Sequence, residues 1–316
     1  QVKDKNGTPA TGKYTPEVTP VTPTGEDVTT IDKQGQVQTG TPTFTEGDPI
    51  APITITEEQP AKFIVNGQPT DEKEIPATKD GTEIGKYKIN PLTGVVTFTP
   101  KPEFVGTVDG VTVQVKDKNG TPATGKYTPE VTPVTPTASP VESIDIQGQK
   151  QTGKPKFVEG DKLVPIDENV KPVFDDGSAR KVVKGEGVYE VDDKGVVTFT
   201  PEKSFVGVTK GVSVKRVDTN GTPVTTTYTP TVVGVTPKGE NVETIDNKGK
   251  TQYGTPTFEG GKTTINGEPK VVEIDKDVPP TFDDGTTTRV VDGEGTYTID
   301  KNGVVTFKPE PEFVGR

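Results

Sequence analysis

Two pairs of adjacent aspartates are the residues of this chain best suited to metal chemistry. They stand in Asp175-Asp176-Gly177 and again in Asp283-Asp284-Gly285. Calcium prefers carboxylate oxygens, which makes Asp175, Asp176, Asp283 and Asp284 weak calcium candidates. Their spacing is not that of an EF-hand loop, and the first sequence unit described below lacks the pair. The pattern therefore favours acidic turns, with no metal site and no cofactor.

Other acidic motifs also predict turns before they predict chemistry. Asp117 begins "DKNG" and Asp218 begins "DTNG", and Asn-Gly steps are typical of tight turns. Paired carboxylates can hydrolyse glycosidic bonds, but nothing here places two acids around a cleft. Every motif also recurs along the chain, which argues against a single active site. We therefore predict no enzyme.

The composition excludes several kinds of site. The 316 residues contain no His, Cys, Met or Trp, so a Ser-His-Asp triad, a thiolate nucleophile, a disulfide and a histidine-ligated zinc site are all impossible. An intramolecular Lys–Asn isopeptide bond would be a cysteine-free cross-link. It needs a lysine buried beside an acid, and the apolar strands contain few suitable lysines.

The charge balance also limits the partners of the chain. The net charge is −11, which argues against nucleic acid and against anionic membrane surfaces. No apolar run approaches the roughly 20 residues that cross a bilayer, so no membrane insertion is expected in this segment. The hydrophobic fraction is only 28%, but short Val/Thr/Phe runs alternate clearly, which favours folded β structure over disorder.

The alternating runs belong to a repeat of domain size. The string "GVVTF" begins at Gly94, Gly195 and Gly303. An alternating Tyr strand precedes each copy, a "FVG" follows it, and a "QTGTPTF"-like strand opens each unit. These markers recur at intervals of 101 to 113 residues, which indicates tandem domains rather than a short-period solenoid.

Turn residues divide each unit into strands. The alternation breaks at Asn90 to Gly94, which predicts a hairpin, and a second hairpin is expected to turn at Asn119-Gly120. About seven short strands per unit and no helical periodicity predict an all-β fold of tandem Ig-like antiparallel β sandwiches arranged end to end. The recurring aromatic residues are expected to pack in the cores or across strands; in the first unit they are Phe44, Tyr87, Phe98 and Phe104.

The unit boundaries follow from an exact duplication. Gln1 to Thr24 is identical to Gln114 to Thr137, where the same passage closes a unit. We therefore divide the chain into the closing strands of a preceding repeat and three repeats, the last of which stops before its closing strands. The boundaries are 1–24, 25–137, 138–238 and 239–316. The proline-rich "TPEVTPVTPT" is expected to be a semi-rigid connection between units.

The combination of "QTGTPTF", "GEGTYTID..GVVTF.PEPEFVG" and "V.VKDKNGTPATGKYTPEVTPVTPT" resembles the CshA-type fibril repeat of Gram-positive, chiefly streptococcal, cell-wall-anchored adhesins. The resemblance covers nearly the whole chain. It implies a run of β domains of about 100 residues that projects from the cell wall. It also implies a separate N-terminal adhesive region and a C-terminal signal that sortase joins to peptidoglycan, so that the expected location is the extracellular bacterial surface.

These observations predict a structural stalk segment in which each repeat contacts its neighbours. Host matrix or other bacteria would be partners of the full-length protein. In the alternative, the repeats themselves bind host glycoprotein or partner microbes through many weak contacts. Beads carrying only the repeats would adhere in that case. A third class, a calcium-stiffened spacer, predicts a melting temperature that falls with a chelator.

The incomplete units at the two ends of this sequence suggest one further expectation. Residues 1–24 carry closing strands without a body, and the last unit has a body without closing strands. The N-terminus of one copy could complete the last unit of another and give head-to-tail oligomers at high concentration. A sedimentation series that finds only monomer would exclude this.

Overall fold

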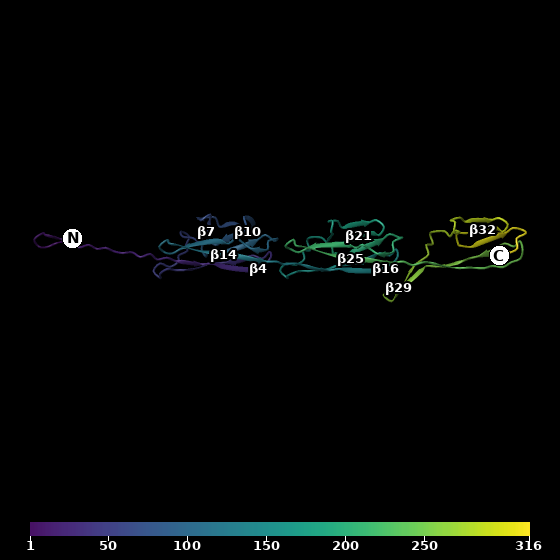
Figure 1. Cartoon of the computed structure of the whole chain (residues 1–316), viewed down its shortest axis with the longest axis horizontal. Coiled ribbons are helices and arrows are strands. Elements are labelled where there is room, and N and C mark those ends of the chain that lie inside the picture. The colour runs from purple at the N-terminus through teal and green to yellow at the C-terminus, as the bar shows by residue number, and fades with distance from the viewer. The chain divides into compact units, whose positions relative to one another are not determined.

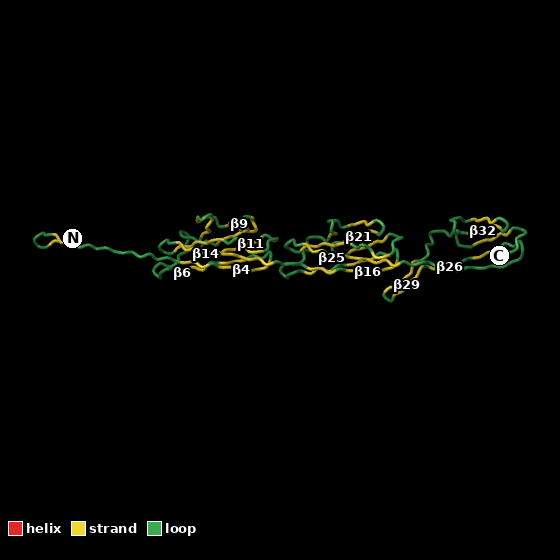
Figure 2. Tube along the Cα trace, viewed as in Figure 1, coloured by secondary structure: helices red, strands yellow, loops and turns green.

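The computed structural model describes all 316 residues and contains strands and turns but no helix (Figure 2). It therefore holds no apolar helix of membrane-spanning length. The chain divides into two compact units, which are described separately. Unit 1 comprises Gln1–Pro136, Glu159–Ile166 and Val217–Thr222, and unit 2 comprises Thr137–Val158, Asp167–Arg216 and Pro223–Arg316.

In unit 1, the first repeat is a sandwich of two sheets (Figure 1). One sheet has the order β5 (Gln38–Gly40), β11 (Val96–Pro100), β10 (Thr82–Ile89) and β9 (Glu74–Lys79). The other has the order β12 (Gly106–Thr107), β14 (Pro122–Thr132), β13 (Val111–Lys116), β7 (Lys62–Val65) and β8 (Gln68–Thr70), and β4 (Val28–Lys33) also pairs with β14. Two short pairs complete the unit: β3 (Thr24–Glu26) with β6 (Thr43–Thr45), and β1 (Val2–Lys3) with β2 (Pro9–Ala10).

In unit 2, the second repeat has the same plan. One sheet has the order β17 (Gln151–Gly153), β22 (Val197–Pro201), β21 (Gly187–Val191) and β20 (Arg180–Val183). The other has the order β16 (Val141–Ile146), β25 (Pro223–Val233), β24 (Val212–Val217) and β19 (Val173–Phe174), and β23 (Gly207–Val208) pairs with β25. β15 (Thr137–Ser139) pairs with β18 (Lys156–Val158).

The third repeat, also in unit 2, repeats one of these sheets. Its order is β27 (Gln252–Gly254), β33 (Val305–Pro309), β32 (Gly295–Ile299) and β31 (Thr288–Val291). Two further pairs are β26 (Lys238–Glu240) with β28 (Thr257–Glu259), and the hairpin of β29 (Gly261–Ile265) and β30 (Glu268–Val272).

The predicted all-β fold of tandem Ig-like sandwiches is confirmed, and so are its two hairpins. β10 and β11 pair antiparallel across a turn at Asn90 to Gly94, where Gly94 adopts a φ of 75°. β13 and β14 pair across Asn119-Gly120, where Gly120 has a φ of 83°. Glycine adopts these left-handed conformations without a side-chain clash, which explains why the turns stand at these positions. Both complete repeats have more strands than the seven expected. The irregular middle of the first repeat forms β7, β8 and β9, and both repeats contain additional short strands such as β3 and β6 or β15 and β18.

The interpretation of the proline-rich segment as a connection was partly wrong. Thr128 to Thr132 belongs to β14 and pairs with β4 along its whole length. Only residues 133–136 follow the strand, and Val134 among them is buried. Proline is tolerated here because Pro129 still offers its carbonyl oxygen, which accepts a hydrogen bond from Val108 N at 3.1 Å.

Aromatic residues fill both complete sandwiches, as predicted. Tyr87 lies opposite Phe98 across β10 and β11, and both side chains are buried. Phe44 and Phe104 pack against this core from partly buried positions. In the second repeat Tyr189 stacks on Phe199 with ring centroids 4.6 Å apart. Directly opposed residues of two paired strands point to the same face of the sheet, so both rings of each cross-strand pair lie in the space between the sheets.

We expect Phe98→Ala to destabilise the first repeat by about 3–5 kcal/mol, because the ring is fully buried and its removal leaves a cavity. Leu92→Ala is the control, since Leu92 is half exposed on the turn before β11 and its loss should change stability by less than about 0.5 kcal/mol. Urea unfolding monitored by NMR resolves the first repeat from the others. Equal effects of the two variants would contradict the assigned core.

Candidate functional site in the first and last strands of each repeat

The first and last long strands of a complete repeat run parallel and side by side. In the first repeat Val28 to Lys33 of β4 pairs with Tyr127 to Thr132 of β14 (Figure 1). In the second, Val141 to Ile146 of β16 pairs with Tyr228 to Val233 of β25. All other strand pairs of the two sandwiches are antiparallel. The terminal pair therefore joins the beginning and the end of a repeat directly.

A buried polar network fixes this terminal pair in the first repeat. Thr30 on β4 donates its hydroxyl to Gln38 Oε1 at 2.6 Å and lies 2.8 Å from the Tyr127 hydroxyl. The same glutamine donates Nε2 to the Glu130 carbonyl oxygen of β14 at 2.9 Å. Three side chains from three strands thus form one closed set of hydrogen bonds. We call this set the terminal lock.

The second repeat contains the same terminal lock. Ser143 donates to Gln151 Oε1 at 2.5 Å and lies 2.7 Å from the Tyr228 hydroxyl. Gln151 Nε2 donates to the Thr231 carbonyl oxygen at 2.8 Å. In the third repeat Thr244 donates to Gln252 Oε1 at 2.6 Å, so that the hydroxyl and amide members recur there as well.

Two glycines shape the space for the lock tyrosines. A β-carbon added at Gly40 would overlap the ring of Tyr127, and one added at Gly153 would overlap the ring of Tyr228. Each ring therefore lies close against the backbone of a strand in the facing sheet. This close approach explains why the "QTG" motif ends in glycine.

Burial changes the acidity of these tyrosines. Loss of contact with water disfavours the phenolate and raises the pKa of Tyr127, against a smaller opposite effect of its bond to Thr30. The pKa of Tyr228 rises for the same reason, with Ser143 opposing it. Burial also raises the pKa of neighbouring Tyr189 to about 12. The lock tyrosines are therefore neutral hydrogen-bonding groups at physiological pH.

The predicted calcium candidates lie elsewhere, in two equivalent exposed turns. Asp176 Oδ1 accepts hydrogen bonds from the Ser178 backbone N at 2.9 Å and from its hydroxyl at 2.7 Å, which lowers the pKa of Asp176. Asp175 pairs with Lys181 Nζ at 3.1 Å. One carboxylate thus orders the turn, and the other is neutralised by a cation.

The second turn is built in the same way. Asp284 Oδ1 accepts from the Thr286 backbone and hydroxyl, which lowers the pKa of Asp284, and Asp283 pairs with Arg289 Nη1 at 3.0 Å. No group of three or more acidic, His or Cys side chains with the geometry to hold a metal ion occurs in the structure. The structure does not bring the two aspartate pairs together.

The "DKNG" and "DTNG" aspartates are fully buried. Asp117 Oδ1 accepts from the backbone N atoms of Asn119 and Thr121 at 2.9 and 2.8 Å, and Asp218 does the same in its own turn. The second oxygen of each carboxylate is buried and has no hydrogen-bond partner. No lysine reaches either carboxylate, so the neighbour that an isopeptide bond requires is not present at these acids.

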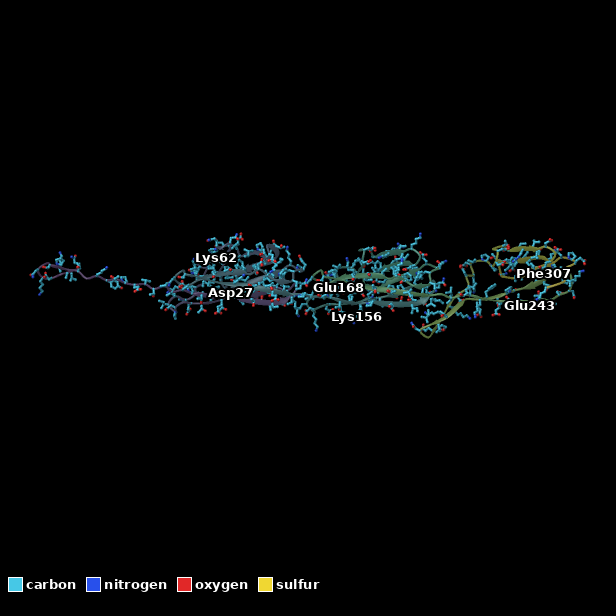
Figure 3. All side chains as sticks on the ribbon, in the orientation of Figure 1. Asp27, Lys62, Lys156, Glu168, Glu243 and Phe307 are labelled. Carbon is cyan, nitrogen blue, oxygen red and sulfur yellow. The ribbon has the colours of Figure 1, made fainter.

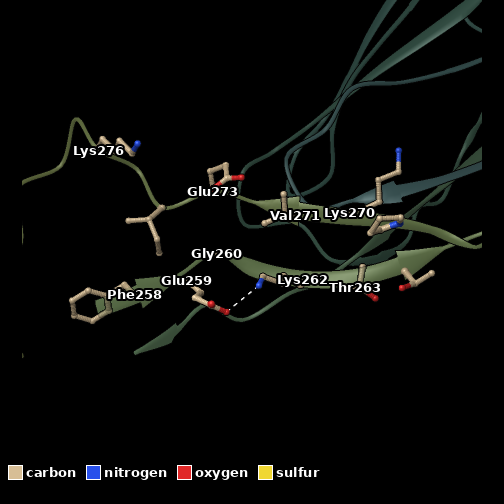
Figure 4. A pocket seen from close by; sticks show the side chains of 12 residues that line it. Phe258, Glu259, Gly260, Lys262, Thr263, Lys270, Val271, Glu273 and Lys276 are labelled. Atoms are coloured by element: carbon tan, nitrogen blue, oxygen red, sulfur yellow. Dashed lines mark hydrogen bonds and ion pairs between the residues drawn. The ribbon is translucent and has the colours of Figure 1, made fainter. Parts of the chain in front are cut away.

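A pocket with a volume of about 930 Å³ lies in the third repeat, beside the hairpin of β29 and β30 (Figure 4). Its charged side chains have both signs. Lys262 pairs with Glu259 at 2.9 Å, and Glu273 lines the same space as Lys270 and Lys276. Three lysines and two glutamates thus line the pocket, and two of the lysines are held in ion pairs, Lys262 with Glu259 and Lys270 with Asp145.

Sequence reasoning missed the terminal lock, although its members were visible. Gln38 and Gln151 stand in the repeated "QTG" motif, and a tyrosine recurs in both closing strands at Tyr127 and Tyr228. Their recurrence at corresponding positions was the available signal. What the sequence did not indicate was the pairing of β4 with β14, which joins residues about one hundred positions apart.

Comparison with known proteins identifies a family that the chain matches. The chain matches the family described as the repetitive domain of the surface adhesin CshA at residues 20–131, 133–232 and 234–316. The NMR structure of repeat domain 13 of the fibrillar adhesin CshA from Streptococcus gordonii is 60% identical to the matched part. That match covers 22% of this chain and 90% of the solved domain, with a TM-score of 0.15.

Eukaryotic tandem β domains also match. The EC22–24 segment of mouse cadherin-23 is 16% identical, with 68% of this chain and 65% of that chain covered and a TM-score of 0.26. The I9–I11 tandem of titin is 12% identical, with 67% and 64% covered and a TM-score of 0.29. No curated protein matches the chain.

We expect the protein to lose stability as the pH rises from about 10 toward 12. The raised tyrosine pKa values mean that the folded state keeps protons that the unfolded state releases above its ordinary pKa of about 10. This contribution is fully present below pH 10. Melting temperatures between pH 8 and 11.5 test it: the fall should be shallower in the double variant Tyr127→Phe/Tyr228→Phe, which lacks two of the ionising groups. An unchanged slope would contradict the assignment.

Proposed function

Because this chain belongs to the family of surface adhesin CshA repeats, we propose that it is a stalk segment of a bacterial cell-surface fibrillar adhesin. In this proposal the repeats hold an adhesive N-terminal region away from the cell wall. The location is extracellular, and the full-length protein is anchored to peptidoglycan. The family and the β-sandwich fold point to a structural or adhesive role without catalysis.

The observation that carries the proposal is the parallel pairing of the terminal strands. When the first and last strands of a domain run parallel, the chain enters at one end of the domain and leaves at the opposite end. Domains of this kind can follow one another in series, each adding its own length. An antiparallel terminal pair would return the chain to the end at which it entered. The topology of each repeat therefore supports a spacer.

The same pairing suits a segment under tension. A force applied to the two ends of the first repeat pulls β4 and β14 in opposite directions along their axes. The backbone hydrogen bonds between them are then loaded in shear and must fail together, whereas a force across the strands would open them one by one. The terminal lock adds side-chain hydrogen bonds at Thr30, Gln38 and Tyr127 to the same interface.

Repeat boundaries at 1–24, 25–137, 138–238 and 239–316 agree with this proposal, because each complete repeat then contains both of its terminal strands. Contacts with host matrix or with other bacteria belong in this proposal to the full-length protein. The segment itself provides length and resistance to force.

Small-angle X-ray scattering tests the spacer. Three domains in series should give a maximum dimension of about 100–130 Å and a radius of gyration of about 30 Å or more. A compact particle of the same number of residues would have a radius of gyration of about 20 Å. A value near 20 Å, unchanged between 50 and 500 mM salt, would contradict a spacer.

Pulling single molecules by their two ends tests the role of the terminal lock. We expect Tyr127→Phe/Tyr228→Phe to lower the unfolding force of two domains, because each loses a hydrogen bond across the sheared interface. Tyr87→Phe/Tyr189→Phe is the matched control, since Tyr87 instead donates to the Asp109 carbonyl oxygen outside the terminal pair. Both variants should lose about 1 kcal/mol of chemical stability per domain. Equal forces in the two variants would exclude a mechanical role.

A further inference from the structure

The second repeat contains a pocket that is lined by positive charge. The pocket has a volume of about 400 Å³, and its lining consists of Lys154, Pro155, Lys156, Phe157, Lys194, Gly195 and Arg216. Four of these residues are basic and none is acidic. This is unusual in a chain whose net charge is −11, because a chance cluster of four cations without an acid is least expected on an acidic protein.

The basic residues come from four different places in the fold. Lys154 follows β17, Lys156 lies on β18, Lys194 lies in the turn between β21 and β22, and Arg216 lies on β24 (Figure 3 labels Lys156). Their convergence therefore depends on the sandwich and not on a basic run in the sequence. The second-repeat cations that form ion pairs are Lys171, Arg180, Lys181 and Arg216, which leaves the amines of all three pocket lysines free.

The other repeats show that the fold does not require these cations. The first repeat has Thr41, Thr43, Thr93 and Val115 at the four corresponding positions. The third repeat has Thr255, Thr257 and Asn302 at three of them. The same sheets form in the first repeat around neutral side chains, so the four basic residues are a local property of the second repeat.

Arg216 gives the pocket an unsatisfied donor. Its side chain is only 10% exposed, and its Nε is buried without a hydrogen-bond partner. Its Nη2 donates to Glu168 Oε2 at 3.0 Å, but the Glu168 side chain is 79% exposed and can turn into water. A buried donor without a partner is unfavourable, so an oxyanion that draws the guanidinium toward the pocket would give Nε a partner.

We propose that this pocket binds the anionic group, sulfate or carboxylate, of an acidic polysaccharide. Arg216 supplies a planar donor for the oxyanion, and the three lysines supply charge around it. The half-buried ring of Phe157 forms an apolar part of the lining, against which a sugar face can pack. The acidic remainder of the protein repels a polyanion, so binding depends on this one pocket. The inference goes beyond a spacer role and does not require it.

Titration of the full chain with two oligosaccharides tests the proposal. One is a heparin tetrasaccharide, which is rich in sulfate, and the other is a galacturonate tetrasaccharide, which carries only carboxylates. Affinity is measured by calorimetry at 50 mM salt, and the Arg216 Nε–H resonance is followed by NMR. At least one of the two sugars should bind and shift this resonance. Because heparin carries carboxylates as well as sulfates, binding of the galacturonate sugar shows that a carboxylate suffices, and binding of heparin alone shows that the pocket requires sulfate.

Variants separate the pocket from general electrostatics. Lys154→Thr/Lys156→Thr/Lys194→Thr/Arg216→Val introduces the residues of the first repeat and should weaken binding by about tenfold or more. Arg216→Lys keeps the charge but removes the planar donor, and should weaken binding by about threefold or more. The control Lys88→Thr/Lys101→Thr/Lys116→Thr/Lys118→Thr removes four exposed positive charges from the first repeat and should change affinity less than twofold.

Three results would overturn the proposal. The first is that neither sugar binds at millimolar concentration. The second is that the control weakens binding as much as the pocket variant does. The third is that the pocket variant still binds with unchanged affinity. A melting curve of each variant establishes that it is folded. Arg216→Lys provides an independent test should the fourfold variant unfold, because it is a single substitution that keeps the positive charge and a long side chain.

Discussion

The parallel pair of first and last strands is the constraint on which the rest of each repeat depends. It determines where the chain enters and leaves the domain, and it places the two ends of the repeat in direct contact. It also requires that residues about one hundred positions apart find one register. A one-residue slip of β14 against β4 would turn Tyr127 from the core toward solvent and put a neighbouring side chain in its place. The register therefore has to be specified by more than backbone hydrogen bonds.

The terminal lock provides that specification. An apolar pair such as valine and isoleucine tolerates small shifts, whereas a tyrosine hydroxyl must meet its partner within hydrogen-bond distance. Thr30 and Gln38 are already bonded to each other, so the incoming Tyr127 has a single position in which all three groups are satisfied. Gly40 contributes by leaving room for the ring. The second repeat replaces threonine by Ser143 and keeps the geometry, which indicates that the hydroxyl matters and the methyl group does not.

The sequence predicted the local parts of this architecture and missed its long-range part. The hairpins at Asn90 and Asn119 were predictable because turn residues and alternating strands lie within a dozen residues of each other. The terminal pair was not, since no local pattern links β4 to β14. The second half of β14 was predicted to be a connection because proline has a low propensity for strands, and Pro129 lies in this half. The strand continues there because β14 pairs with β4 along this stretch and the Pro129 carbonyl oxygen accepts a hydrogen bond from Val108 N. Together these interactions outweigh the N–H that proline lacks.

Comparison of the three repeats distinguishes the residues that the fold requires from those that vary. Positions that are kept in every repeat, such as the glutamine of "QTG" and the Tyr–Phe pair across the central hairpin, have a packing or hydrogen-bonding reason in each copy. Positions that are neutral in the first repeat and basic in the second have no such packing reason. Lys154 and Lys194 are separated in sequence but line the same pocket, and their counterparts Thr41 and Thr93 are neutral. The same lining contains Arg216, whose Nε is desolvated and has no hydrogen-bond partner. A scaffold with a fixed core can therefore carry in one repeat a pocket of the kind proposed for Arg216 and the three lysines, while the other repeats keep neutral residues there.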